Sequence, residues 1–436
     1  MEILSKTKES ATIQPQCQYF VLRKKRLCRM TVRPGRQYCG EHEPQPVTED
    51  GKDDTRIPCP NDPKHTCYAS KLEKHLTICN ARQQKQPDYI VQNVNAPEEA
   101  EDIQRQPLSK IPLELILKVI KKVNMLYDTH IKDRIATLSE QPIHTAVQEE
   151  FNEAGRAESS LRHLRQASRL IQVVEDENLN MQNTCFVELG AGKGHLSYYA
   201  WWAWCQHTDS KVLLIDRASL RHKRDNKLRD TNPDDKSNVH RIRADLAHLA
   251  LERVPAVQHC DAVVGYAKHL CGVATDYALR CITADSVVGK VRGAVLATCC
   301  HHRCERAAYL ARGHLRAMGI NGVDFNVILG IVSWATCGDG RSRDRRNQTL
   351  HDIESFAQNN VDMQNDATGT KAGLGTKNLN LTQDEREQIG RRAKALLDWG
   401  RVLYLNERGF DARLVHYVPT SVSLENVCII AKKSIV

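Results

Sequence analysis

The chain has 436 residues, of which 41% are apolar, and its 62 Lys and Arg against 53 Asp and Glu give a formal charge of +9. This length exceeds a single hydrophobic core, so we expect several domains, and the composition excludes a disordered or membrane-embedded chain. The polar start, Met1 to Ser10, lacks the apolar centre of a secretory signal. We therefore expect an intracellular protein of the nucleus or cytoplasm, without a membrane partner, whose positive charge favours a polyanion such as nucleic acid.

The first predicted module spans residues 14–45 and is a CCCH-type zinc finger. The sequence has sixteen cysteines, and in a reducing compartment they favour metal ligation over disulfides. Ten residues separate successive cysteines of the first cluster and two precede its histidine. Four such ligands complete a closed tetrahedral zinc site. The predicted ligands are Cys17, Cys28, Cys39 and His42.

The second predicted module spans residues 56–82 and follows the order C-x5-H-x9-H-x3-C. Its predicted ligands are Cys59, His65, His75 and Cys79, which leaves Cys67 as a spare small apolar residue. His75 and Cys79 lie four positions apart, as two ligands on one face of a short helix do. The pattern resembles the CHHC finger of some RNA-processing proteins. Neither module buries enough apolar surface to fold alone, so we expect two structural Zn²⁺ ions to replace a core.

A helical connector is predicted over residues 105–178. Apolar residues recur at helical spacing in IPLELILKVIKKVNMLYDTHI, which starts at Ile111, and again from Ser159 to Val174. We expect these helices to pack against the domain that follows.

The remainder, residues 179–436, alternates short β-rich runs with helical ones. The runs are TCFVEL, KVLLID, VHRIRADL, DAVVGYAKHL and GAVLATCC, and they predict a parallel sheet with helices on both faces. A polar stretch at about 338–380 is interpreted as a flexible insertion. A helix is expected from Thr382, its N-cap in a capping box with Glu385, to Trp399, before two closing strands. The predicted fold is an α/β, Rossmann-like methyltransferase domain with a seven-stranded, mostly parallel sheet and a reversed terminal strand.

A glycine-rich turn follows the first strand of this domain and is the predicted cofactor site. The turn reads E-x-G-x-G-x-G, and its residues are Glu188, Gly190, Gly192 and Gly194. Glycines let the backbone turn tightly and approach a ligand. Dinucleotide enzymes use a related turn, so the motif alone does not discriminate.

Acidic strand ends tip the prediction toward S-adenosylmethionine. Glu188 precedes the first glycine, where a carboxylate helps to hold the methionine end of the cofactor. Asp216 ends the next strand, placed to accept from the ribose hydroxyls, and Asp245 ends the third, placed to bind the adenine amino group. Three acidic strand ends in succession are the usual methyltransferase arrangement.

Two clusters at the ends of the fourth and fifth strands carry the predicted chemistry. The first is KHLCG, with Lys268, His269 and Cys271, and the second is CCHHRC, which contains His301. In open α/β sheets, ligands bind beyond the carboxyl ends of the strands, so we expect both clusters to lie over the cofactor. Methylation of a ribose hydroxyl needs a group that removes its proton, and Lys268 is the preferred base because burial beside a sulfonium lowers its pKa. His269 and His301 are the alternatives. A third zinc on the group Cys299, Cys300, His301, His302 and Cys304 is also left open.

Together, the CCCH and CHHC clusters, HLRQAS, ELGAGKGHLS, KHLCG and CCHHRC resemble the eukaryotic tRNA 2′-O-methyltransferase family that modifies the fourth nucleotide of the acceptor stem. The resemblance spans most of the chain. It implies S-adenosylmethionine as donor, tRNA as partner and a 2′-O-methylated product. Basic residues between Arg217 and Arg243, and from Arg303 to Arg316, fit an RNA partner.

Two other interpretations remain open. One is a carbon-five base methyltransferase with Cys271 as nucleophile. The other is a zinc-finger RNA-binding scaffold whose methyltransferase fold has lost activity. The intact glycine turn and the acidic strand ends argue against the scaffold.

Overall fold

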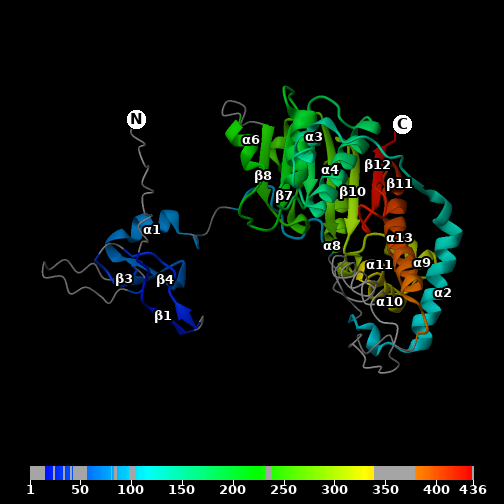
Figure 1. Cartoon of the computed structure of the whole chain (residues 1–436), viewed down its shortest axis with the longest axis horizontal. Coiled ribbons are helices and arrows are strands. Elements are labelled where there is room, and N and C mark those ends of the chain that lie inside the picture. The colour runs from blue at the N-terminus through cyan, green and yellow to red at the C-terminus, as the bar shows by residue number, and fades with distance from the viewer. Residues whose placement is uncertain are drawn as a thin grey trace, which may run out of the picture. The chain divides into compact units, whose positions relative to one another are not determined.

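The computed structural model describes residues 15–22, 25–32, 35–39, 42, 56–79, 81–82, 86–97, 104–231, 238–337 and 379–434. The chain divides into two compact units, Met1–Gln86 and Pro87–Val436 (Figure 1). The insertion expected at about 338–380 lies outside the described residues, apart from its last two positions. No helix in the described ranges is both long enough and apolar enough to cross a membrane.

The first unit contains two small modules, and their described residues bury few apolar side chains. Strands β1 (Phe20–Val21) and β2 (Arg26–Leu27) form an antiparallel pair, beside which three cysteines and Val32 make a buried cluster. Strands β3 (Arg56–Cys59) and β4 (Asp62–Tyr68) pair in the same way and precede helix α1 (Leu72–Ile78), which buries none of its side chains. The described residues of this unit therefore bury too few apolar groups to form a conventional hydrophobic core.

The second unit is built on an eight-stranded sheet in the order β5-β11-β12-β10-β9-β6-β7-β8. Its strands are β5 (Ile135–Thr137), β6 (Thr184–Leu189), β7 (Lys211–Asp216), β8 (Val239–Arg243), β9 (Ala262–Cys271), β10 (Val291–Cys299), β11 (Phe410–His416) and β12 (Val427–Lys433). Among these strands β12 alone runs against its neighbours, which confirms the mostly parallel sheet with a reversed terminal strand. The expected number of seven is corrected to eight, because β5 pairs with β11 and is too short to show an alternating pattern.

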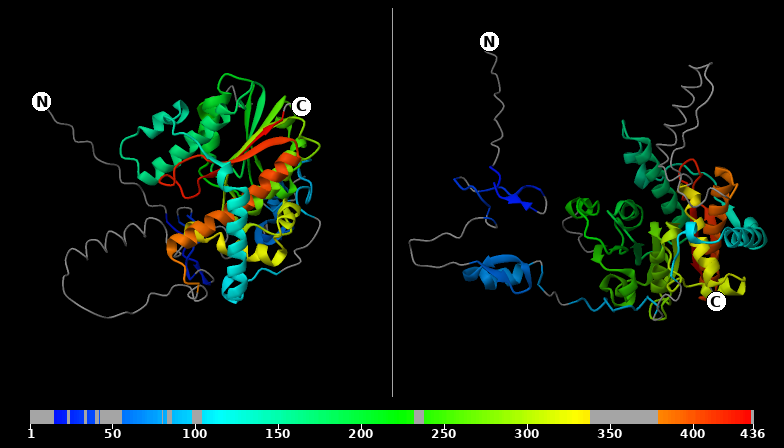
Figure 2. Two further views of the ribbon diagram at one scale, coloured as in Figure 1. Left: turned by 90° about the vertical axis from the view of Figure 1, so that its right-hand side faces the viewer. Right: turned by 90° about the horizontal axis from the view of Figure 1, so that it is seen from below.

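Helices cover both faces of the sheet, and strand residues alternate between two hydrophobic clusters. In β7, Leu213 and Ile215 face one cluster, and Val212 and Leu214 face the other. Figure 2 shows the helices around the sheet, with α2 and α13 crossing on one side. The first face packs against α2 (Leu113–His130), α8 (Val273–Thr283), α10 (Gly322–Ile331) and α13 (Gln383–Glu407), and the second against α3 (Thr145–Phe151), α4 (Glu158–Asp176) and α5 (His195–Ala200).

Shorter helices complete the second unit. They include α6 (Asn226–Thr231), α7 (Pro255–Gln258), α9 (Arg312–Ala317) and α11 (Trp334–Cys337), and among the single-turn helices η7 (Leu246–His248) and η9 (His301–Arg303).

Helix α13 begins as predicted and ends later than predicted. The Glu385 N–H donates to Thr382 Oγ1 at 3.2 Å and the Thr382 N–H to Glu385 Oε2 at 2.7 Å, which completes the capping box. The helix continues to Glu407 rather than stopping at Trp399. Val402 and Leu405 are fully buried, so the apolar stripe extends two further turns and holds the helix against the sheet.

Candidate active site and metal centres

The glycine-rich turn joins β6 to α5 at the carboxyl edge of the sheet. Gly190, Gly192 and Gly194 have φ angles of 76°, 53° and 77°, a backbone region that favours glycine. A Cβ on Gly192 would meet open space, whereas one on Gly194 would lie 2.8 Å from Asp225, Arg241 and Leu214. Gly192 therefore leaves room for a ligand, and Gly194 allows the turn to pack on the sheet.

Asp216 closes this turn from the end of β7. Its Oδ2 accepts the Gly192 N–H at 2.8 Å and its Oδ1 accepts the Ala218 N–H at 2.7 Å. Asp245, the N-cap of η7, accepts the Ala247 N–H at 3.0 Å and keeps 36% of its side chain exposed. Both carboxylates keep unused acceptor positions at the same edge of the sheet.

Glu188 points into the protein rather than into solvent. Its carboxylate accepts the Ser197 N–H at 3.1 Å and also the Ser197 hydroxyl, which lies 2.7 Å from the Tyr266 hydroxyl. Burial raises the pKa of Glu188 to about 7. Because its partners are protein groups, Glu188 stabilises helix α5, which follows the turn.

Two ion pairs that support the turn were not predicted from the sequence. The Arg241 guanidinium binds the fully buried Asp225 carboxylate at 2.8 and 3.0 Å and donates to the Gly192 carbonyl at 3.0 Å. Arg224 pairs with Glu150 on α3. Both arginines belong to the basic stretch that was assigned to RNA, and the structure shows that they also brace the turn.

Lys268 lies near the turn, at the edge of the sheet where β9 and β10 end. This edge is called the rim below. The β6–β9 register sets Tyr266 opposite Glu188, so Lys268, two residues on, reaches the level of Gly190. Its Nζ donates to the His163 carbonyl oxygen at 3.2 Å and lies 3.1 Å from His163 Nδ1. Burial lowers the pKa of Lys268 to about 8. His163 belongs to the HLRQAS segment, so the signal for this residue was present in the sequence but was not assigned.

His269 is exposed next to Lys268. Its ring stands edge-on to that of His163, with 6.1 Å between the centroids. Desolvation by the surrounding loop, and then the charge of Lys268, lower the pKa of His269.

Three cysteines meet at the ends of β9 and β10. The Cys271 and Cys299 sulfurs are 3.0 Å apart, and Cys300 lies with them, all three sulfurs falling within 4.8 Å of one another. Hydrogen bonding from Cys299 lowers the pKa of Cys271 to about 6. The group for which a third zinc was left open is divided, because Cys299 and Cys300 join Cys271, whereas His301 contacts Asp398 and Cys304 contacts Arg401.

His301 is buried beneath the rim, with 2% of its surface exposed. Its Nε2 lies 2.8 Å from the Asp398 carboxylate, which also accepts Thr298 Oγ1 at 2.7 Å and an Arg401 N–H at 2.8 Å. Burial lowers the pKa of His301. This placement favours a positioning role over proton transfer to substrate.

Arg401 connects this buried network to the segments that follow β9 and β10. Its Nη2 donates to Asp276 at 2.7 Å, to Cys304 Sγ at 3.2 Å and to the Gly272 carbonyl at 3.4 Å. The guanidinium thereby ties α8 and α13 to the loops that carry Cys271 and Cys300.

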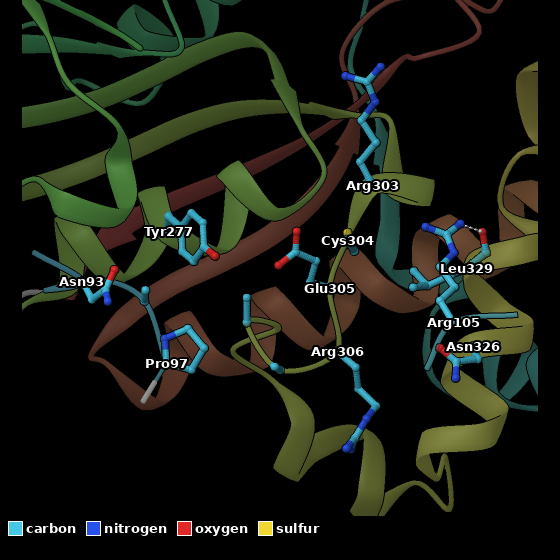
Figure 3. A pocket seen from close by; sticks show the side chains of 13 residues that line it. Asn93, Pro97, Arg105, Tyr277, Arg303, Cys304, Glu305, Arg306, Asn326 and Leu329 are labelled. Atoms are coloured by element: carbon cyan, nitrogen blue, oxygen red, sulfur yellow. Dashed lines mark hydrogen bonds between the residues drawn. The ribbon is translucent and has the colours of Figure 1, made fainter. Parts of the chain in front are cut away.

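A cavity of about 610 Å³ opens beside these loops (Figure 3). Arg105 spans one side and donates to the Leu329 carbonyl at 3.3 Å, while Tyr277 and Glu305 face the interior. Arg303 also lines the cavity and is exposed, and its guanidinium extends away from the other labelled side chains. Basic groups therefore border the candidate site on this side.

The two N-terminal clusters bring their predicted ligands together. In the first, His42 Nδ1 lies 3.3 Å from Cys39 Sγ and 3.6 Å from Cys17 Sγ, and Cys28 Sγ lies 4.0 Å from Cys39 Sγ. In the second, Cys59 and Cys79 sulfurs are 3.6 Å apart, and His65 and His75 approach them to 3.4 and 3.2 Å. Each set of four donors fits a tetrahedral zinc ion.

The sheet order, the glycine turn and the acidic strand ends define a Rossmann-like methyltransferase, here combined with two metal-binding fingers. Family models agree: "Methyltransferase TRM13" matches residues 165–432, "CCCH zinc finger in TRM13 protein" residues 15–43, and "U11-48K-like CHHC zinc finger" residues 56–80. The chain belongs to the TRM13 methyltransferase family, which confirms the resemblance seen in the sequence.

Relatives match along nearly the whole chain. The mouse (Mus musculus) "tRNA:m(4)X modification enzyme TRM13 homolog" is 34% identical over 96% of this chain and 94% of its own length. The human protein of the same description is 32% identical over 95% and 94%. The "tRNA:m(4)X modification enzyme TRM13" of Saccharomyces cerevisiae is 29% identical over 96% of each chain.

Proposed function

We propose that this protein transfers a methyl group from S-adenosylmethionine to the ribose 2′-hydroxyl of nucleotide 4 in the tRNA acceptor stem. Membership of the TRM13 family supports this, because the names of the mouse and yeast relatives specify tRNA:m(4)X modification. A tRNA substrate also implies that the protein acts inside the cell, in nucleus or cytoplasm. The observation that carries the chemistry is the position of Lys268 on the rim, level with the glycine turn.

Gly190, Gly192, Asp216 and Asp245 are the residues proposed to hold the cofactor. The open space over Gly192 and the unused acceptor positions of the two aspartates fit a nucleoside with ribose hydroxyls and an adenine amino group. When bound, S-adenosylmethionine supplies an electrophilic methyl group on a sulfonium. Glu188 and Gly194 act beneath the turn, the first by anchoring Ser197 and the second by allowing close packing.

Lys268 is the proposed general base. A ribose hydroxyl is a weak nucleophile, so its proton must leave as the oxygen reacts. The lowered pKa of Lys268, about 8, keeps part of its amine neutral and able to accept that proton at Nζ. The His163 carbonyl oxygen accepts from Nζ and fixes the direction of the amine. His269, the exposed neighbour, is the second candidate for this role.

Two rival functions would use the residues of the rim differently. A carbon-five base methyltransferase needs Cys271 as a nucleophile that attacks the base, and its product carries the methyl on a carbon atom. An inactive scaffold needs neither cofactor nor base. The bracing of the glycine turn by Asp216 and Arg241 disfavours the scaffold, because it holds the turn in a conformation that leaves open space over Gly192.

Two Zn²⁺ ions are proposed for the finger clusters, and the fingers are proposed to help dock tRNA. The first finger contains a basic run around Cys28, and basic groups neutralise phosphate. The His75→Ala variant removes one ligand of the second cluster, so it should retain one zinc ion fewer per chain and bind tRNA more weakly. Affinity for S-adenosylmethionine should be unchanged in the same variant.

The decisive assay incubates the full chain with unmodified tRNA and donor labelled in the methyl group. The labelled RNA is then hydrolysed in alkali. Ribose methylation blocks cleavage at the modified linkage, so the label should appear in an alkali-resistant dinucleotide. Label in mononucleotides would overturn the ribose assignment in favour of base methylation, and absence of label would favour the scaffold.

A further inference from the structure

The three-cysteine cluster on the rim is not used by the proposed methyl transfer. Cys271 is the last residue of β9 and Cys299 the last of β10, and the parallel register of these strands sets the two side by side. Cys300 follows directly. Their three sulfurs lie within the same mutual distance, 4.8 Å, as the four donors of each zinc finger.

The backbone beside the cluster has positive φ angles at two residues. Cys300 has φ 49° and ψ 41°, the left-handed region, which is unfavourable for a residue with a side chain. Facing it, Gly272 has φ 56°, and a Cβ there would lie 2.5 Å from Arg303 Cβ. Such strain persists when surrounding interactions hold it. A disulfide between Cys271 and Cys299 would leave Cys300 without a share in the bond, whereas a metal ion engages all three.

An ion can reach this cluster from solvent. Cys271 and Cys300 are half-buried, while the other cysteines of the second unit whose side chains the structure describes are buried. Two neighbouring donors have other partners: His301 binds Asp398, and Cys304 accepts from Arg401. The site therefore offers three thiols, two of them half-buried.

We propose that Cys271, Cys299 and Cys300 bind a third zinc ion that holds the carboxyl ends of β9 and β10 together. Three soft sulfur ligands select zinc or another thiophilic metal over magnesium or calcium. Each thiol releases its proton to solvent on binding, and no oxidation takes place. Tetrahedral Zn–S bonds of about 2.3 Å set sulfurs about 3.8 Å apart. The Cys271–Cys299 pair thus opens slightly from 3.0 Å. The fourth coordination position remains for water or substrate.

The test is the zinc content of the full chain, purified with a thiol reductant and dialysed against zinc and then buffer. Wild type should retain three zinc ions per chain. Cys271→Ser and Cys300→Ser should each retain two, with unchanged circular dichroism. The control, Cys260→Ala, removes a buried cysteine at the opposite end of the sheet and should retain three.

Two zinc ions in wild type overturn the proposal, as do three in both serine variants, because the third ion would then be bound elsewhere. A Cys271–Cys299 disulfide detected by mass spectrometry in protein with two zinc ions also overturns it. If Cys271→Ser fails to fold, Cys300→Ser gives the same comparison, since Cys300 lies outside the strands. A methyl-transfer assay on wild type is independent of this count, so failure of the zinc site leaves the proposed function standing.

Discussion

The Gly192 N–H donates to the Asp216 carboxylate at 2.8 Å, so residues 24 positions apart close one edge of the candidate cofactor site. The β6–β7 pairing makes this possible, because parallel neighbours end at the same edge of the sheet. The bond keeps the turn in a conformation whose outer side faces open space.

Replacing Asp216 with alanine should weaken cofactor binding. The carboxylate accepts two backbone N–H groups and is proposed to bind the cofactor ribose. Hydrogen bonds to a charged group contribute about 1.5–3 kcal/mol. The dissociation constant for S-adenosylmethionine should therefore rise about 10- to 100-fold by calorimetry. Asp261→Ala, whose carboxylate binds Asn183 at the other end of the sheet, is the control and should bind normally.

The rate of methyl transfer should rise with pH. Lys268, with its pKa lowered to about 8 by burial, acts as base only when deprotonated. Its neutral fraction is about a tenth at pH 7 and about nine tenths at pH 9, so kcat should increase roughly tenfold and then level. Lys268→Arg should be almost inactive, because guanidinium stays protonated. A flat pH profile, or an active arginine variant, would exclude Lys268 as the base.

Glu188→Gln should move that pH profile to lower pH. The Glu188 carboxylate raises the pKa of Lys268 and so opposes the effect of burial. Glutamine removes the charge and retains an acceptor for Ser197. The midpoint of the kcat profile should then fall below about 8. Glu177→Gln, near the C-terminal end of α4, should leave it unchanged. A midpoint that stays unchanged or rises in Glu188→Gln would show that the Glu188 charge does not raise the pKa of Lys268.

Arg401→Met should destabilise the second unit strongly. It leaves Asp276 and Asp398, both fully buried, without their cationic partner. Breaking one side of a buried pair costs about 3–5 kcal/mol. Just after the same helix, at its C-cap, Arg408→Met removes an exposed pair with Asp285 and should cost at most about 1 kcal/mol. Denaturant unfolding of both variants measures the difference, and equal losses would contradict the buried network.

Arg303→Ala should weaken tRNA binding and reduce its dependence on salt. Arg303 is exposed beside the rim, where a phosphate of the acceptor stem is expected. Losing one phosphate contact lowers the slope of log K against log salt by about one. Arg292→Ala, an exposed residue at the opposite end of β10, is the control. The same slope in both variants would place the RNA elsewhere.

Local patterns in the sequence predicted the strands well, and long-range pairings were missed. The bounds of β6 and β7 match the runs TCFVEL and KVLLID, because apolar runs between turn signals are visible locally. The Asp276–Arg401 pair joins residues 125 positions apart, and no periodicity reveals such a partner. Cys299 was grouped with its sequence neighbours, whereas the strand register sets it against Cys271.

Methyl transfer to the ribose 2′-oxygen of nucleotide 4 is tested by removing that one oxygen atom from the substrate. Two synthetic tRNAs that differ only in a 2′-deoxy sugar at nucleotide 4 are assayed with the full chain and labelled S-adenosylmethionine. The ribose substrate should be fully methylated and the deoxy substrate should not be methylated, while both bind equally. Equal methylation of the two substrates would contradict it.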